Sequence, residues 1–153
     1  MGPEARRQII RGRRNLKNLS MARDYAERAL WSMREAEQAL DGGNTAICVR
    51  RSQEATELAA KAILRRLAIE YPREHDVSDA IAASVEKLPE YLRNRVEEIK
   101  SLLTELARVR GPAFYGYEIE GIPANQAFTK DYAAEILSKT KLLVNLCHRF
   151  ATT

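Results

Sequence analysis

Apolar side chains recur at intervals of three and four residues along most of the chain, which predicts helices throughout. The clearest stripe runs from Thr45 to Ala68, with Asn44 placed to cap its start and Pro72 just past its end. Small and aliphatic residues cover more than half of the circumference of this helix. We therefore expect it in the middle of a bundle, with neighbours packed closely against it.

The same spacing predicts three more long helices and one short helix, and no strand pattern or internal repeat is visible. The sequence therefore predicts an all-α, up-and-down bundle of four long helices plus one short helix. Besides the central helix, the expected elements are residues 21–40, 78–88, 89–110 and 130–150.

Glycine positions predict where the helices stop. The Asp41–Asn44 turn is short enough to make the first two long helices antiparallel neighbours. Gly12 should interrupt a weak helix at residues 6–19, and Gly111 should end the helix before it. Residues 111–128 form the longest irregular stretch and carry four aromatic residues, so we expect this loop to pack on the body or to serve a site.

Composition limits the class of protein. With 153 residues, 45% apolar and 30% charged, the chain has the balance of one globular domain. No apolar run approaches the roughly 18 residues of a membrane span, and the basic N-terminus lacks the apolar region of a secretory signal. We expect a cytoplasmic protein that does not bind membranes. Cys48 and Cys147 are expected as buried free thiols, and neither a metal site nor a cofactor is predicted.

The positive charge is concentrated at the N-terminus. Residues 1–18 hold six basic groups against one acid, a balance of +5, whereas the whole chain carries +4. We therefore divide the chain into a basic arm, residues 1–19, and a bundle domain, residues 20–153. The arm is either a contact for nucleic acid or an acidic partner, or a solvated extension of the first helix. The candidate RNA contacts are Arg11, Arg13, Arg14, Lys141 and His148.

One charged strip crosses the apolar central helix. Its residues are three or four positions apart and so share one face: Arg50, Glu54, Glu57, Lys61 and Arg65. Such spacing produces ion pairs on a helix surface, here Glu57 with Lys61 and Glu54 with Arg50. The alternative is a binding site.

Three motifs in order point to a known family. They are the run Gln53–Leu64, His75-Asp76 after it, and an Arg-x-x-x-x-Tyr-Gly pattern from Arg110 to Gly116. A helix ending in ALDGGN precedes them and a capped helix follows. Over roughly residues 20–150 this order resembles the HEPN domain of prokaryotes, and its archaeal single-domain members in particular.

The resemblance implies a bundle of four or five helices that is usually a homodimer. Members are often encoded beside a minimal nucleotidyltransferase, in toxin–antitoxin-like systems, and the family has been proposed to bind nucleotides. A site that binds phosphate needs cations and N–H donors, and a site that binds a base needs a flat aromatic ring on which the base can stack. The candidate nucleotide-binding residues are therefore Lys61, Arg65, His75, Asp76 and Arg110, with Tyr115 as a stacking ring.

Some branches of the family are ribonuclease toxins, which carry an Arg followed by His after four to six residues. Neither His75 nor His148 has an Arg at that distance before it, and Lys141 precedes His148 by seven residues. The sequence shows no other catalytic constellation. Three functions stay open: a nucleotide-binding component of a nucleotidyltransferase-linked system, a non-catalytic homodimeric protein-interaction module, and a protein that binds or cuts RNA, which the missing motif disfavours.

Overall fold

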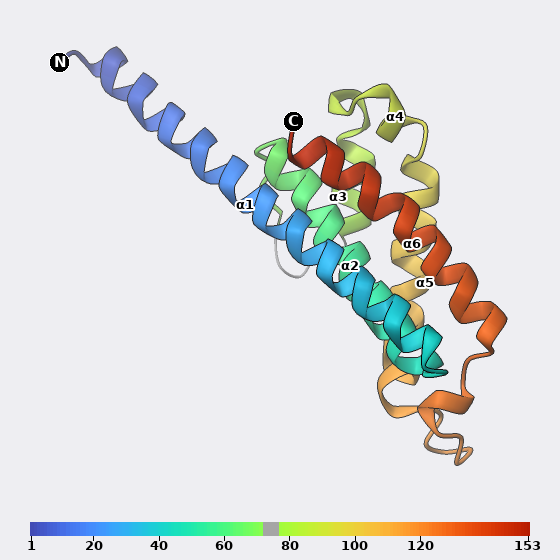
Figure 1. Cartoon of the computed structure of the whole chain (residues 1–153). Coiled ribbons are helices and arrows are strands. Elements are labelled where there is room, and N and C mark those ends of the chain that lie inside the picture. Colours follow the sequence, from blue (N-terminus) through green and yellow to red (C-terminus); the bar gives the residue numbers. More distant parts are fainter. Residues whose placement is uncertain (72–76) are drawn as a thin grey trace.

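Helix α2 (Thr45–Arg66) lies at the centre of the structure and packs against α1, α5 and α6 (Figure 1). The computed structural model describes residues 1–71 and 77–153, and the fold in these residues confirms the predicted all-α bundle with four long helices. The other elements are α1 (Pro3–Asp41), α3 (Val77–Ala83), η1 (Val85–Lys87), α4 (Glu90–Arg93), α5 (Val96–Tyr115), η2 (Ala124–Gln126) and α6 (Lys130–Ala151).

Helix α2 begins as its sequence predicts. The side-chain oxygen of Asn44 accepts a hydrogen bond from the backbone N–H of Ile47 at 3.0 Å, which satisfies one of the unpaired donors of the first turn. The helix ends at Arg66, and Ala68 then adopts a left-handed conformation with φ of 57°. Alanines on several sides of α2 are fully buried, which allows the neighbouring helices to approach closely.

Helix α1 is continuous over 39 residues, so the prediction that Gly12 interrupts it was wrong. A single glycine in a helix costs only about 1 kcal/mol relative to alanine, and the helix-forming residues on both sides outweigh that cost. The first 17 residues are exposed, and this part of α1 extends away from the body (Figure 1).

The helix predicted at residues 89–110 differs from the structure at both ends. It is divided into α4 and α5, and α5 continues past Gly111 to Tyr115. Pro112 lies inside α5 and supplies no N–H, but its carbonyl accepts the N–H of Gly116 at 2.8 Å. Val109 and Ala113 are buried in the core, and their packing holds this last turn in helical form.

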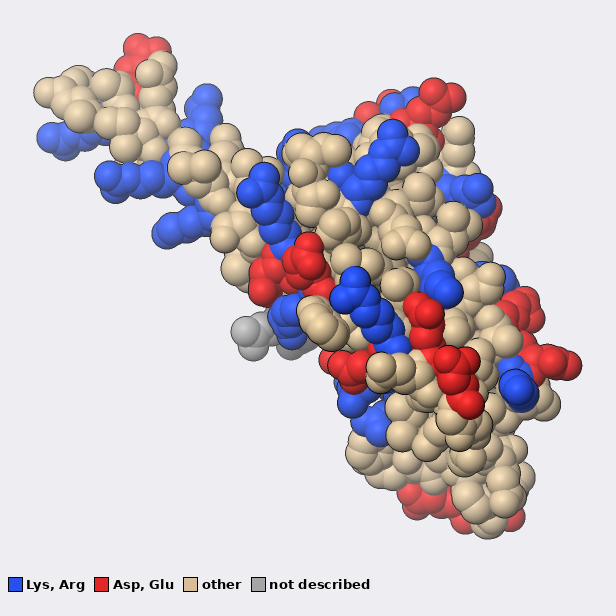
Figure 2. Space-filling model, viewed as in Figure 1, with Lys and Arg blue, Asp and Glu red and all other residues tan. Residues whose placement is uncertain are grey.

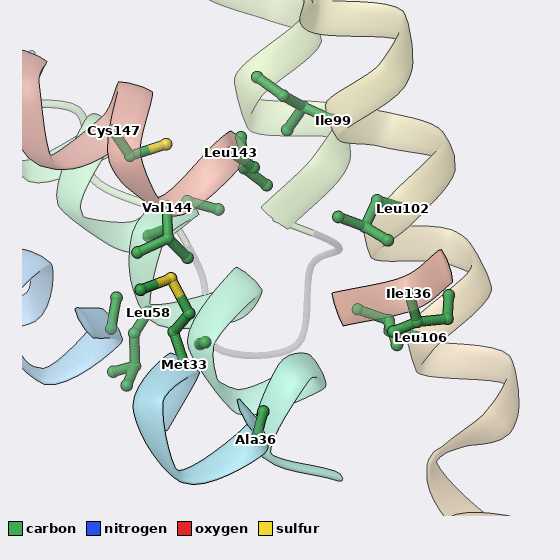
Figure 3. Packing of buried hydrophobic residues seen from close by; sticks show 14 of the residues in the cluster. Met33, Ala36, Leu58, Ile99, Leu102, Leu106, Ile136, Leu143, Val144 and Cys147 are labelled. Carbon is green, nitrogen blue, oxygen red and sulfur yellow. The ribbon is translucent and has the colours of Figure 1, made fainter. Parts of the chain in front are cut away.

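The core combines side chains of the four long helices, among them Met33, Leu58, Leu106 and Val144 (Figure 3). Both cysteines are buried and free, as predicted. Burial raises the pKa of the Cys48 and Cys147 thiols, which keeps them protonated and unreactive. None of the helices in the described part of the chain has the length and apolarity needed to cross a membrane.

Candidate functional site

A groove of about 720 Å³ opens between the first half of α2 and the end of α5, and we call it the α2–α5 groove. It contains part of the charged strip of α2 together with two aromatic residues that the extended α5 presents. Its polar and aromatic lining consists of Arg50, Arg51, Gln53, Glu54, Glu57, Arg110, Phe114 and Tyr115.

A sharp reversal after α5 fixes one end of this groove. Gly116 has φ of 71°, and a Cβ at this position would overlap the carbonyl oxygen of Ile122. Only glycine therefore fits between α5 and the returning chain. Tyr117 and Ile122 then exchange two backbone hydrogen bonds of 2.9 and 3.0 Å, which close the turn. The reversal keeps Phe114 and Tyr115 at the end of a helix instead of in a slack loop.

The irregular stretch is also tied to the start of α2. The side-chain oxygen of Asn125 accepts the backbone N–H of Thr45 at 2.8 Å, and the hydroxyl of Thr45 donates to the backbone oxygen of Asn125 at 3.0 Å. These bonds confirm the prediction that this loop packs on the body.

Most charges of the strip are already paired. Glu54 pairs with Arg51 at 2.8 Å and not with Arg50, so that predicted pair was wrong. Arg51 also pairs with Glu35 at 3.0 Å. Glu57 pairs with Lys61 at 3.5 Å, as predicted, although the distance is long for a strong ion pair and both groups are partly exposed.

Arg50 takes a different partner. Its guanidinium carbon lies 4.4 Å from the centre of the Phe114 ring, in the geometry of a cation–π contact. Phe114 and Tyr115 in turn meet edge to face, with ring centres 4.5 Å apart. Within the described residues neither Arg50 nor Arg110 forms an ion pair, so the N–H donors of both can serve an anion.

The structure brings together only part of the predicted nucleotide site. Arg110 and Tyr115 line the α2–α5 groove, but Lys61 and Arg65 do not. Arg65 follows Arg50 by 15 residues, about 22 Å along a helix, and its guanidinium lies 3.5 Å from the side-chain oxygen of Asn18. The remaining two candidates, His75 and Asp76, lie outside the described residues.

The predicted RNA contacts fall into two groups. Arg11, Arg13 and Arg14 are exposed on the projecting part of α1. Lys141 and His148 instead face α1, where Lys141 lies 3.4 Å from Glu37 and Nε2 of His148 lies 2.8 Å from Glu27. Those partners favour a structural role for both residues.

Sequence reasoning missed Arg50 and Phe114 as site residues. Arg50 was placed on the charged strip, but its ring partner lies 64 positions later in a segment predicted to be a loop. The usable signal was two adjacent aromatic residues, Phe114 and Tyr115, next to glycine and proline. Exposed aromatic pairs of this kind are typical of binding surfaces.

As far as the structure describes it, the lining of the groove contains arginines, carboxylates and a tyrosine but no histidine. In the part of the chain that the structure describes, the imidazole of His148 lies on α6 and does not line the groove. No cluster of metal-binding side chains occurs among the described residues either. The lining combines three arginines and two aromatic rings with the carboxylates of Glu54 and Glu57, which pair with Arg51 and Lys61.

The fold and the groove define an all-α bundle protein with a groove lined by arginines, carboxylates and aromatic rings. A family model described as the HEPN domain matches residues 22–150. The chain therefore belongs to the HEPN family, as the sequence motifs predicted. No curated protein and no solved structure matches the chain.

Proposed function

We propose that the α2–α5 groove binds a nucleotide. The observation that carries this proposal is the meeting of Arg50, Arg110 and the Phe114–Tyr115 pair in one groove. Arg50 and Arg110 would hold the phosphates, because a guanidinium forms paired hydrogen bonds to phosphate oxygens. Tyr115 would stack on the base, a contact that is typically worth about 1–3 kcal/mol.

Calorimetric titration with ATP, GTP and a short single-stranded RNA tests the proposal. We expect one saturable site for at least one of the mononucleotides. Arg110→Ala should weaken it by roughly 10- to 100-fold, since it removes hydrogen bonds to a charged group. Tyr115→Ala should weaken it by a similar factor through lost stacking.

Lys61→Ala is the matched control. It also removes one cation, but Lys61 does not line the groove and its 3.5 Å ion pair with the groove residue Glu57 is partly exposed, so nucleotide affinity should stay within about twofold of the wild-type value. A folded protein that binds none of the ligands would overturn the proposal. An equal loss of nucleotide affinity in Lys61→Ala and Arg110→Ala would indicate that the nucleotide binds farther along α2, near Lys61.

We further propose that the protein acts as a homodimer in a nucleotidyltransferase-linked, toxin–antitoxin-like system in the cytoplasm. Membership of the HEPN family supports this role. Size-exclusion chromatography of the protein with a minimal nucleotidyltransferase, with and without ATP, tests it. We expect a joint peak, and separate elution under both conditions would contradict the proposed partnership.

A further inference from the structure

The arm, residues 1–19, leaves the body of the protein as a helix whose first 17 residues are exposed (Figure 1). The residues matched by the family model begin at 22, so the arm precedes the matched domain. It continues helix α1, so it has no separate nucleation cost, but its exposed residues gain no stability from packing on the body. Because most helical stability in proteins comes from the packing of an apolar face, a second surface against the arm would stabilise it.

One face of the arm is apolar. Ala5, Ile9, Gly12, Leu16 and Leu19 follow one another at intervals of four, three, four and three residues, which is the spacing of a helix that packs along another helix. Ile9 is 42% exposed and Leu16 is 68% exposed. Basic side chains occupy the remaining faces, and Figure 2 shows them along the arm. The arm is thus an amphipathic, positively charged helix whose apolar face is uncovered.

A second groove offers a matching surface. It lies between α5 and α6, has a volume of about 550 Å³, and we call it the α5–α6 groove. Its apolar lining includes Leu102, Leu142 and Leu146, and Leu142 is 43% exposed. Its charged lining holds four carboxylates, those of Glu97, Glu98, Glu105 and Glu135, against the two cations Arg95 and Lys139, a net charge of −2.

The arm and the α5–α6 groove match in length, both expose apolar side chains, and carry opposite net charges. The α6 wall of the groove runs from Tyr132 to Leu146, and the apolar face of the arm runs from Ala5 to Leu19. Each covers 15 residues, about 21 Å along a helix. The arm carries +5 over residues 1–18, whereas the lining of the groove carries −2, or −1 once Arg108, which pairs with Glu105 at 2.7 Å, is included. Attraction between these charges would steer the arm to the groove and set its orientation.

The arm cannot reach the groove of its own chain. It is the start of the unbroken helix α1, whose second half packs on α2 and α6, and it points away from the body (Figure 1). We propose that the arm of one copy docks in the α5–α6 groove of a second copy, which returns its own arm in the same way. Such a reciprocal exchange forms a closed two-fold dimer. The exchange rests on the homodimer proposed above and gives it an interface, which is separate from the α2–α5 groove and does not depend on nucleotide binding.

The oligomeric state of substituted full-length chains tests the exchange. Ile9→Glu with Leu16→Glu places two carboxylates on the docking face. We expect the dissociation constant of the dimer, measured by sedimentation, to rise at least roughly 100-fold. Both side chains are exposed in the single chain, so the bundle should stay folded. Ile119→Glu is the control. It also adds a carboxylate, but on the loop after α5, where Ile119 is 98% exposed and lies outside the docking face.

Disulfide trapping identifies the docking partner directly. A chain with Leu16→Cys mixed with a chain with Leu142→Cys should form a mixed disulfide dimer under mild oxidation. The native thiols Cys48 and Cys147 are buried and should not compete. A chain with Leu16→Cys mixed with one carrying Ile119→Cys should form none.

Three results would overturn the exchange. The first is a wild-type chain that stays monomeric at tens of micromolar, including one whose arm binds RNA or anionic vesicles instead. The second is a dimer that survives Ile9→Glu with Leu16→Glu unchanged. The third is the absence of mixed Leu16–Leu142 disulfides from a dimeric protein.

Discussion

A single exposed side chain, Asn125, joins the loop after α5 to the start of α2. Its oxygen accepts the N–H of Thr45 at 2.8 Å and lies 3.4 Å from the N–H of Ala46. Both N–H groups belong to the first turn of α2, which has no intrahelical acceptors for them. Asn44, the residue just before α2, caps the same turn, so two asparagines far apart in sequence both satisfy its N–H groups.

Replacing Asn125 should therefore weaken the fold as the loss of a cap does. We expect Asn125→Ala to lower the free energy of unfolding by about 1 kcal/mol, measured by urea denaturation. Gln126→Ala, on the next exposed residue of η2, should leave it within about 0.5 kcal/mol. Equal effects of the two substitutions would contradict the capping role.

Glu105 and Tyr132 link α5 and α6 through a short hydrogen bond. The phenol of Tyr132 donates to a carboxylate oxygen of Glu105 at 2.6 Å, and Arg108 donates to the same oxygen at 2.7 Å. The bond from Tyr132 and then the nearby Arg108 lower the pKa of Glu105, against a smaller opposing effect of burial. The pKa of Tyr132 is raised, first by burial and then by its carboxylate partner.

The direction of the Glu105 shift gives a pH dependence. A lowered pKa in the folded state means that the carboxylate stabilises the fold above the pKa of unfolded Glu, about 4.3, and that this contribution disappears as pH falls through the folded-state pKa. The stability difference between wild type and Glu105→Gln should therefore be larger at pH 7 than at pH 3. Urea denaturation across this range measures it, and a difference independent of pH would contradict the assignment. Glu118→Gln, on the exposed loop, is the control.

The end of α5 shows how an element depends on what lies next to it. Gly111 looks like a stop signal in sequence, yet a Cβ at Gly111 would meet nothing within 4 Å and the helix continues through it. Gly116 is the residue that ends α5, because the returning chain at residues 122–124 lies directly against it. This close approach exists only once the loop has folded back.

Two glycines with similar φ angles differ in the room that they leave for a side chain. Gly116 has φ of 71° and Gly121 has φ of 69°, but only Gly116 lacks room for a Cβ. Gly121→Ala should cost about 1–2 kcal/mol through strain alone, and Gly116→Ala should cost clearly more. Thermal unfolding measures both. Gly116→Ala should also weaken nucleotide binding, since it displaces the end of α5. Equal losses of stability in Gly116→Ala and Gly121→Ala would show that the overlap at Gly116 is relieved easily.

The arm is the element with the weakest local support. Gly12 lies at its middle, and a Cβ there would meet no atoms within 4 Å. Gly12→Ala should favour the helix by about 1 kcal/mol and raise the helical signal in circular dichroism at low protein concentration. Ala5→Gly should lower that signal by a similar amount. No change in either variant would mean that the arm is already fully helical without a partner.

At the scale of the whole molecule, the arm and the α2–α5 groove lie at opposite ends of α2. Asn18 of the arm contacts Arg65 near the end of α2, whereas the α2 wall of the groove runs from Val49 to Glu57. Deleting residues 1–18 should therefore leave nucleotide affinity within about twofold of the full chain, measured by calorimetry at two salt concentrations. A strong loss would place the arm in the site. For RNA, a salt slope that falls by about 0.7 for each lost phosphate contact would show that the arm binds the backbone.

The sequence by itself determined most of the helical architecture and the family. Asn44 caps α2 as predicted, and Thr129 caps α6 in the same way, since a cap depends on residues three positions apart. Apolar spacing also placed both cysteines in the core, and the ordered motifs identified a HEPN domain. These features depend on short-range patterns that the chain carries locally.

Only the tertiary structure decided which residues form the candidate site. Arg110 and Tyr115 meet Arg50 and Phe114 because α5 continues past Gly111 and packs beside the first half of α2. Lys61, on the same strip of α2, is left outside the groove. A helix face gathers residues over its whole length, but a groove selects those opposite a neighbouring helix. That selection depends on long-range packing and on the close approach of the returning chain to Gly116. Neither can be predicted from a local sequence pattern.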